Sequence, residues 1–126
     1  MEAIKYLKQA DFPYLNDFLK KFRIDNQTVF AYDNTIFANH NLPPDILEHE
    51  LVHIKRMADN PDKWIRQYLK SKQFRLAEEI IAFRFQINSI KNREARNHCR
   101  QECANNLSDV LYDNLVSYAE AMKLLS

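Results

Sequence analysis

The chain has 126 residues, of which 46% are hydrophobic and 28% are charged, and its formal net charge is +1 at neutral pH. This length and composition suit one globular domain, and a charge so close to zero argues against a protein that holds nucleic acid or an acidic membrane through its overall field. The sequence contains no glycine, which excludes the phosphate-binding P-loop and the glycine-rich dinucleotide turn.

The sequence also bears on where the protein works. Its longest apolar runs are far shorter than a membrane span, and the N-terminus has no apolar core of a secretory signal. The two cysteines, Cys99 and Cys103, lie four positions apart in an expected helix and are too few for a disulfide scaffold. We therefore expect a cytoplasmic protein that has neither a membrane nor nucleic acid among its partners.

The first 40 residues contain two different patterns. Up to about Phe22, apolar residues recur at helical spacing, which predicts a helix that breaks or restarts at Pro13 and makes residues 1–26 a helical extension. The following stretch, QTVFAYDNTIFANH, is rich in β-branched and aromatic residues on both sides of Asp33-Asn34. That composition predicts a β-hairpin with a tight turn.

The rest of the chain is predicted to be helical. Two prolines followed by Asp45 are typical of a helix start, and this helix is expected to continue to about Ala58. Three further helices are expected, beginning at Asn60-Pro61, near Lys72 with an end as late as Cys103, and at Ser108 or Asp109. The predicted class is α+β, mostly helical, with one domain over residues 1–126 and a small antiparallel β element just before the helix that contains Asp45.

That helix contains the sequence HELVH, from His49 to His53. Residues i and i+4 share one helix face, so the two histidines can present neutral ring nitrogens to one metal ion. Glu50 lies roughly 100° round the helix from His49, where it can accept a proton from a water molecule bound to that ion. This is the arrangement of zinc peptidases, with the glutamate as general base.

The other faces of the helix bear on this hypothesis. Leu47, Leu51, Ile54 and Ala58 recur at helical spacing roughly opposite the histidines. The pattern predicts a helix that is buried along this apolar stripe and only partly apolar around the histidines. The alternative is that the histidines lie on a solvated face and bind nothing.

A catalytic zinc site needs a third protein ligand. In FRLAEEIIAFRF, Glu79 falls at the edge of the apolar stripe, whereas Glu78 falls on the far side, in solvent. A carboxylate bordering the core needs compensation, which a zinc ion supplies, so Glu79 is the expected third ligand. The alternative is an ion pair between Glu79 and an arginine such as Arg75.

Two other sets of residues are candidates for a role. The cluster of His98, Cys99 and Cys103 is too sparse for a structural zinc site, which has four ligands. A peptidase also needs a group that stabilises the oxyanion. The sequence leaves four candidates for it, namely His40, Tyr68, His98 and Tyr112.

Three segments, HELVH, FRLAEEIIAFRFQ and ANNLSDVLYDNLVSYAEAMKLL, together resemble a group of small, mostly phage-encoded metallopeptidases with a zincin-like core. The resemblance covers roughly residues 28–125. In that group the helix after the His-Glu-x-x-His helix carries a glutamate three residues before an alanine, which is the relation of Glu79 to Ala82. The chain departs from the group at Ile81, where a second acid is usual, and at Phe83, where tyrosine is common.

The resemblance implies zinc-dependent hydrolysis of a peptide or protein substrate, with zinc on His49, His53 and Glu79 and with Glu50 as the catalytic base. It also implies a strand that pairs with extended substrate, expected here at Thr35–Asn39. The rival expectation is a catalytically silent phage structural or interaction protein on the same scaffold, with virion or host proteins as partners. A phage protein would be found in the host cytoplasm or in the virion. A DNA-associated helical protein is disfavoured by the balanced charge.

Overall fold

The computed structural model describes residues 3–109 and 115–126. Within them lie three short strands, β1 (Lys5–Leu7), β2 (Phe30–Tyr32) and β3 (Thr35–Phe37), and a 3₁₀ turn at Gln9–Asp11. The helices are α1 (Leu15–Lys21), α2 (Pro44–Met57), α3 (Pro61–Lys70), α4 (Lys72–Asn88), α5 (Arg93–Ser108) and α6 (Tyr118–Leu124). Mostly helical, with one small mixed sheet, the protein has the predicted α+β class.

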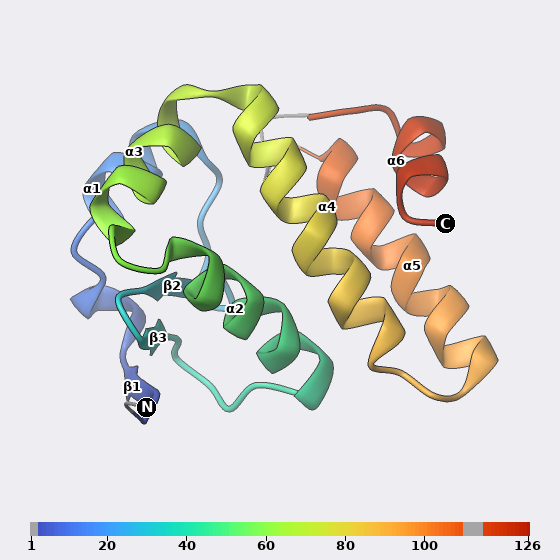
Figure 1. The fold of residues 1–126 in the computed structure, drawn as a ribbon, viewed down its shortest axis with the longest axis horizontal. Coiled ribbons are helices and arrows are strands. Elements are labelled where there is room, and N and C mark those ends of the chain that lie inside the picture. The colour runs from blue at the N-terminus through green and yellow to red at the C-terminus, as the bar shows by residue number, and fades with distance from the viewer. Residues whose placement is uncertain (1–2, 110–114) are drawn as a thin grey trace.

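The helices and the sheet divide into two halves that meet along α2 and α4. Figure 1 shows the sheet, α1 and α3 at one end and α5 and α6 at the other. The first half has a mainly aromatic core of Phe12, Phe18, Phe22, Phe30, Phe37, Trp64 and Tyr68, with Ala31, Met57 and Ile65. The second half packs Phe83 and Ile87 of α4 against α5 and α6. Packing between α2 and α4 joins the two halves.

The predicted hairpin is confirmed. Strands β2 and β3 pair antiparallel, with Phe30 opposite Phe37. The turn between them is made by Asp33 and Asn34, whose φ angles are 46° and 64°. Two successive left-handed residues are what a two-residue hairpin turn requires, and Asp and Asn adopt that conformation more readily than other residues with a side chain. They supply the turn in a chain that has no glycine.

The N-terminal prediction is wrong over its first part. Residues 5–7 form strand β1, which pairs parallel with β3, and the helix is confined to Leu15–Lys21. A few apolar residues at helical spacing carry only a weak preference, and pairing with a sheet edge overrides it. The segment is also no extension, because its strand belongs to the sheet and Phe12 and Phe18 lie in the aromatic core.

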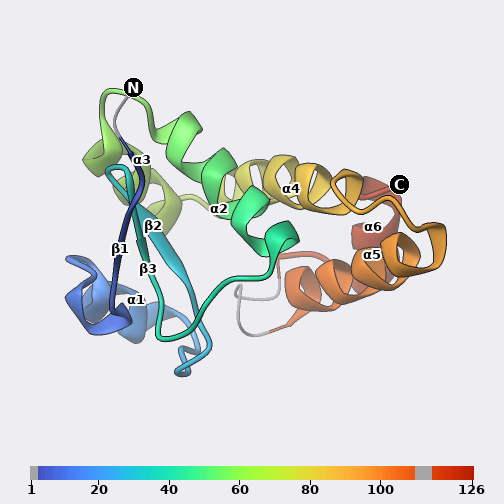
Figure 2. The same cartoon turned by 90° about the horizontal axis from the view of Figure 1, so that it is seen from below.

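Pairing with β1 changes which strand is at the edge of the sheet. The strand order is β1-β3-β2, so β3 has a neighbour on both sides (Figure 2). The expectation that Thr35–Asn39 offers a free edge to a substrate is therefore wrong. Of the two outer strands, β2 is the one that packs against α2.

The helix boundaries agree with the sequence at the starts of α2, α3 and α4. Helix α4 ends at Asn88 rather than near Cys103, and α5 begins after Asn92, whose side chain accepts a hydrogen bond from the Ala95 amide. The start predicted at Ser108 or Asp109 is wrong, since Ser108 is the last residue of α5. Residues 110–114 of that predicted helix lie outside the described residues, and α6 is capped by the Ser117 side chain.

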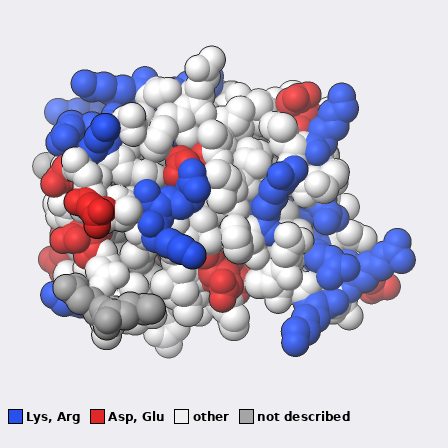
Figure 3. Space-filling model, in the orientation of Figure 1, with Lys and Arg blue, Asp and Glu red and all other residues white. Residues whose placement is uncertain are grey.

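The distribution of charge on the surface agrees with the nearly zero net charge of the sequence, and the helices agree with its lack of long apolar runs. On the face shown in Figure 3, Lys and Arg side chains lie in separate patches among acidic and uncharged ones. This face of the described chain therefore has no continuous basic stripe. None of the helices in residues 3–109 and 115–126 combines the length and the apolar character that crossing a membrane requires.

A buried arginine joins α4 to the end of α3. Arg75 is 1% exposed, and its Nη1 donates hydrogen bonds to the carbonyl oxygens of Tyr68, at 2.6 Å, and Leu69, at 3.3 Å. Its guanidinium lies 5.2 Å from the centroid of the Phe22 ring. Arg75 thus fixes the backbone from which the Tyr68 side chain projects.

Replacing this arginine is expected to destabilise the fold. In Arg75→Met the Tyr68 carbonyl loses the hydrogen bond from the guanidinium in a buried place, and removing one partner of a buried hydrogen bond costs about 1–3 kcal/mol. Lys72→Met, which removes an exposed charge from the same helix, is the matched control and is expected to change stability by less than ~0.5 kcal/mol. Urea unfolding of the three proteins measures the difference, and equal stability of the two variants would contradict the assigned role.

Candidate metal centre

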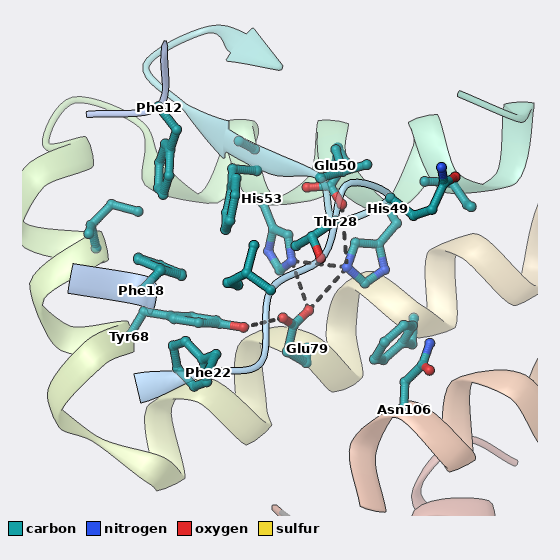
Figure 4. Close-up of a pocket in the computed structure, with 18 of the residues that line it drawn as sticks. Phe12, Phe18, Phe22, Thr28, His49, Glu50, His53, Tyr68, Glu79 and Asn106 are labelled. Carbon is teal, nitrogen blue, oxygen red and sulfur yellow. Dashed lines mark hydrogen bonds and ion pairs between the residues drawn. The ribbon is translucent and has the colours of Figure 1, made fainter. Parts of the chain in front are cut away.

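The three predicted ligands come together between α2 and α4 (Figure 4). The Nε2 atoms of His49 and His53 are 3.1 Å apart, and they lie 3.0 and 2.8 Å from Oε1 of Glu79. The three residues are 4%, 5% and 2% exposed. In the described part of the chain, these side chains form the one group of three or more His, Cys, Asp or Glu residues close enough to share a metal ion.

The donor atoms fit a cation better than they fit one another. Each of the three lies within hydrogen-bond distance of both others, although a neutral imidazole nitrogen can either donate or accept but not both. Ligands about 2.0–2.2 Å from a tetrahedral zinc ion are separated by roughly 3.3–3.6 Å. Small outward shifts of these side chains would therefore admit an ion between them.

The charge of Glu79 also suits a metal ligand. Burial by itself would raise the pKa of this carboxyl, but the neighbouring His53 and hydrogen bonds from both histidines outweigh that effect and hold its pKa well below the usual range. Its second oxygen, Oε2, accepts a hydrogen bond from the Tyr68 hydroxyl. Glu79 is therefore an oriented carboxylate at neutral pH, the form that binds cations.

The predicted base lies next to this cluster. Glu50 is 8% exposed, and its Oε2 is 4.0 Å from Nε2 of His49. Burial raises the pKa of Glu50 to about 7, with the charge of Glu79 acting in the same direction and that of His49 opposing it. A carboxyl with such a pKa can take up and release a proton near neutral pH.

Aromatic packing orients the two imidazoles on the sides that do not contact Glu79. The His49 ring lies 4.5 Å from the Phe83 ring, and the His53 ring lies 5.2 Å from Trp64, measured between centroids. The Nδ1 atoms of both histidines are buried and have no hydrogen-bond partner among the described residues. Metal-binding histidines usually donate Nδ1–H to an acceptor, so the rings here depend on their aromatic neighbours for orientation.

Glu78 is a correction to the sequence analysis. Instead of pointing into solvent it is 4% exposed, and it accepts hydrogen bonds from Arg56 at 2.9 and 2.8 Å and from Trp64 Nε1 at 2.8 Å. Burial would raise the pKa of Glu78, but these hydrogen bonds outweigh it and lower the pKa. The carboxylate thereby holds in place the indole that packs against His53. The pattern of α4 alone could not show this, because α2 and α3 supply both partners.

Burial of α2 differs from the prediction, which placed the apolar stripe as the buried face. Its buried residues are His49, Glu50, His53 and Met57, whereas the apolar stripe opposite is half-buried and ends at an exposed Ala58. The polar face is covered because it turns toward α4 and the aromatic core. A helix that buries two histidines and a glutamate in preference to leucines has a polar site inside the protein.

The remaining sequence candidates separate clearly. His98 is exposed on α5, and its Nε2 lies 2.6 Å from Oε1 of Glu102. Cys99 and Cys103 are buried, with their sulfurs 3.9 Å apart. His98 and the two cysteines therefore do not converge on one point. Among the oxyanion candidates, Tyr68 contacts the cluster through its hydrogen bond to Glu79. A cavity lies beside the cluster, and neither His40 nor His98 lines it. Tyr112 lies outside the described residues.

Removing the Tyr68 hydroxyl is expected to weaken metal binding. Tyr68→Phe removes the hydroxyl that donates to Glu79 Oε2, and losing a hydrogen bond of this kind to a metal ligand lowers affinity about 10–100-fold. Tyr32→Phe is the control, because the Tyr32 hydroxyl donates to Asp62 and not to the cluster. Zinc titration against a competing chelator gives the zinc dissociation constants of both variants. An unchanged affinity in Tyr68→Phe would show that the hydroxyl does not support the site.

A search of family models, curated proteins and solved structures found no match to this chain. The geometry of the cluster establishes a buried His-His-Glu group that could hold a metal ion, with a second buried carboxyl beside it.

Proposed function

We propose that the protein is a zinc-dependent peptidase with a zincin-type centre, in which His49, His53 and Glu79 bind the ion. The observation that carries the proposal is the convergence of three ligand atoms within 3.1 Å of one another, with the Glu50 carboxyl 4.0 Å from one of them. Two imidazoles and one carboxylate favour zinc over magnesium or calcium, which prefer all-oxygen sites.

When bound, zinc would supply the Lewis acidity that activates water at neutral pH and polarises a peptide carbonyl. The side chains of the protein would do the rest. Glu50 accepts the proton of the attacking water and passes it to the leaving amine. Tyr68 keeps the Glu79 carboxylate in its ligand orientation through Oε2, and the aromatic neighbours of the histidines hold their Nε2 atoms toward it.

An extended substrate would lie along β2 (Phe30–Tyr32). This outer strand packs against α2, and its Phe30 and Ala31 border the cavity at the cluster. Main-chain hydrogen bonds to an outer strand hold a peptide without regard to its side chains. The substrate would thus be an unfolded or extended segment of a peptide or protein.

The proposal is tested by mass spectrometry of a mixed peptide pool after incubation with zinc-loaded protein. Cleavage is expected that stops on adding a chelator and returns when zinc is restored. Intact peptides after long incubation with protein shown to carry one zinc per chain would contradict peptidase activity.

A second candidate has an observation in its favour. The two Nδ1 atoms without acceptors, together with Ile81 and Phe83 in place of polar residues, leave the ligands with fewer supporting hydrogen bonds than zinc enzymes usually have. A catalytically silent zincin-like phage structural or interaction protein would tolerate that loss. In that case Glu50→Gln would leave the biological role intact, whereas a peptidase would lose it.

A further inference from the structure

A cavity of about 310 Å³ opens beside the metal centre. Figure 4 shows Phe12, Phe18 and Phe22 at one end of it and the histidines and glutamates at the other. We propose that this cavity selects substrates by taking up a large aromatic or aliphatic side chain next to the scissile bond. The inference rests on the proposed peptidase function and specifies its substrate class.

The walls of the cavity favour an apolar occupant. Away from the metal centre they consist mainly of aromatic and aliphatic side chains, including Phe12, Phe18, Phe22, Ile24 and Phe30. Aromatic rings in such a pocket contact an incoming ring edge to face or in offset stacks. Burying an apolar side chain there removes its surface from water without requiring a polar partner.

The size of the cavity is suited to a large side chain. A cavity of about 150 Å³ is enough to hold a benzene ring, and a water molecule occupies about 30 Å³. The 310 Å³ available would therefore hold one aromatic side chain, together with an ion and a water molecule at the polar end. A small side chain such as alanine would leave most of this space without contacts, so it would bind less well.

The charges around the cavity disfavour an ionic occupant. No lysine or arginine is among the described residues that line it. Of the carboxylates, Glu79 belongs to the metal cluster, Glu50 lies beside it, and Asp25 accepts hydrogen bonds from the Gln27 amide and the Thr28 hydroxyl. An acidic side chain entering the cavity would lose hydration and find no basic side chain to pair with, and a basic one would have to compete with the hydrogen bonds that Asp25 already accepts.

The wall that faces α2 is held in place. Segment 24–29 lines the cavity, and the side-chain amide of Gln9 donates to the carbonyl oxygens of Asp25, at 2.7 Å, and Thr28, at 2.8 Å. Asn39 donates to the carbonyl oxygen of Asn26 at 3.4 Å. A cavity with a tethered wall is formed before the ligand arrives, and selects by shape more sharply than a loose one.

Direct binding tests the inference without requiring catalysis. Trp64 is the only tryptophan in the chain and lines the cavity, so its fluorescence reports on an occupant. Zinc-loaded and metal-free protein are titrated with N-acetyl-phenylalaninamide, N-acetyl-leucinamide, N-acetyl-alaninamide and N-acetyl-lysinamide. The first two are expected to bind at least tenfold more tightly than the last two. Equal affinities, or tighter binding of the lysine derivative, would overturn the proposal.

A filling variant ties the binding to this cavity. Ile24 is half-buried and lines the cavity, and Ile24→Phe is expected to weaken N-acetyl-phenylalaninamide binding at least fivefold while zinc affinity stays the same. Leu19→Phe makes a similar enlargement at a side chain that is 51% exposed and outside the cavity, and is expected to change neither. Equal effects of the two variants would overturn the assignment.

Sequencing the products of the peptide pool separates this inference from the proposed function. Cleavage beside Phe, Tyr, Trp, Leu or Met residues supports both. Cleavage without such a preference supports the peptidase and overturns the inference. Selective binding of the apolar amides with no cleavage of any peptide leaves the cavity's selectivity standing and contradicts the peptidase.

Discussion

Protein purified without chelators is expected to contain about one zinc ion per chain, and His49→Ala and Glu79→Ala are each expected to contain less than a tenth of that. Each variant removes one of three ligand atoms that lie within 3.1 Å of one another. A zinc site reduced to two protein ligands has lost much of the binding free energy that holds the ion against dialysis. Inductively coupled plasma mass spectrometry of untagged protein gives the ratio directly.

The controls separate this site from other histidines and from unfolding. His98→Ala removes an exposed histidine of α5 and is expected to keep the full zinc content. A chelator should lower the melting temperature of the wild type, because a ligand at 100 times its dissociation constant stabilises by about 2.7 kcal/mol. The chelator should not change the melting temperature of Glu79→Ala. Absence of metal from a folded wild type would contradict the assigned site.

Local periodicity was enough to predict which three side chains form the cluster that could hold a metal ion. His49 and His53 share a face because they are four apart on one helix, and Glu79 borders the apolar stripe of another. The spacing does not show that the two helices pack face to face. That packing brings Oε1 of Glu79 to 2.8 Å from Nε2 of His53, 26 residues earlier, and to 3.0 Å from Nε2 of His49, 30 residues earlier. The expectation came from the chemistry of the motif, and the geometry agrees with it.

Three of the failed predictions concern interactions with other segments. Glu78 was assigned to solvent because α4 was considered alone, yet Arg56 of α2 and Trp64 of α3 cover it. The N-terminal strand was read as helix because its pairing with β3 has no signature within residues 5–7. Because of the same pairing, β3 lies at the centre of the sheet and not at the edge, where it was expected. Neighbours distant in sequence decided each case.

Glu50→Gln is expected to abolish peptidase activity while leaving the zinc content unchanged. Glutamine has nearly the same shape as glutamate but cannot accept the proton of the attacking water, and losing a general base lowers turnover about 10²–10⁴-fold. Glu48→Gln changes an exposed glutamate two residues earlier on the same helix and is the matched control. Activity that survives in Glu50→Gln would exclude this carboxyl as the base and favour a non-catalytic role.

The pH profile gives a second test of the same carboxyl. Because the base acts only when deprotonated, activity should rise with pH through the pKa of Glu50, which burial raises to about 7 in the metal-free protein. A bound cation would stabilise the carboxylate and move this rise to lower pH. A rate that falls as pH increases from 5 to 7 would contradict the assignment.

The same shift predicts that Glu50 destabilises the metal-free fold. Its pKa is raised from 4.5 to about 7 on folding, so the folded state binds the proton more tightly than the unfolded state does. The contribution of Glu50 to the free energy of unfolding should therefore fall as pH rises from about 4.5 to 7, by on the order of 1–3 kcal/mol. Glu50→Gln removes the ionisable group and should be more stable than the metal-free wild type at pH 8, with little of this difference at pH 4. A gain in stability joined to a loss of activity is the expected signature of a residue kept for chemistry, and urea unfolding at the two pH values would reveal it.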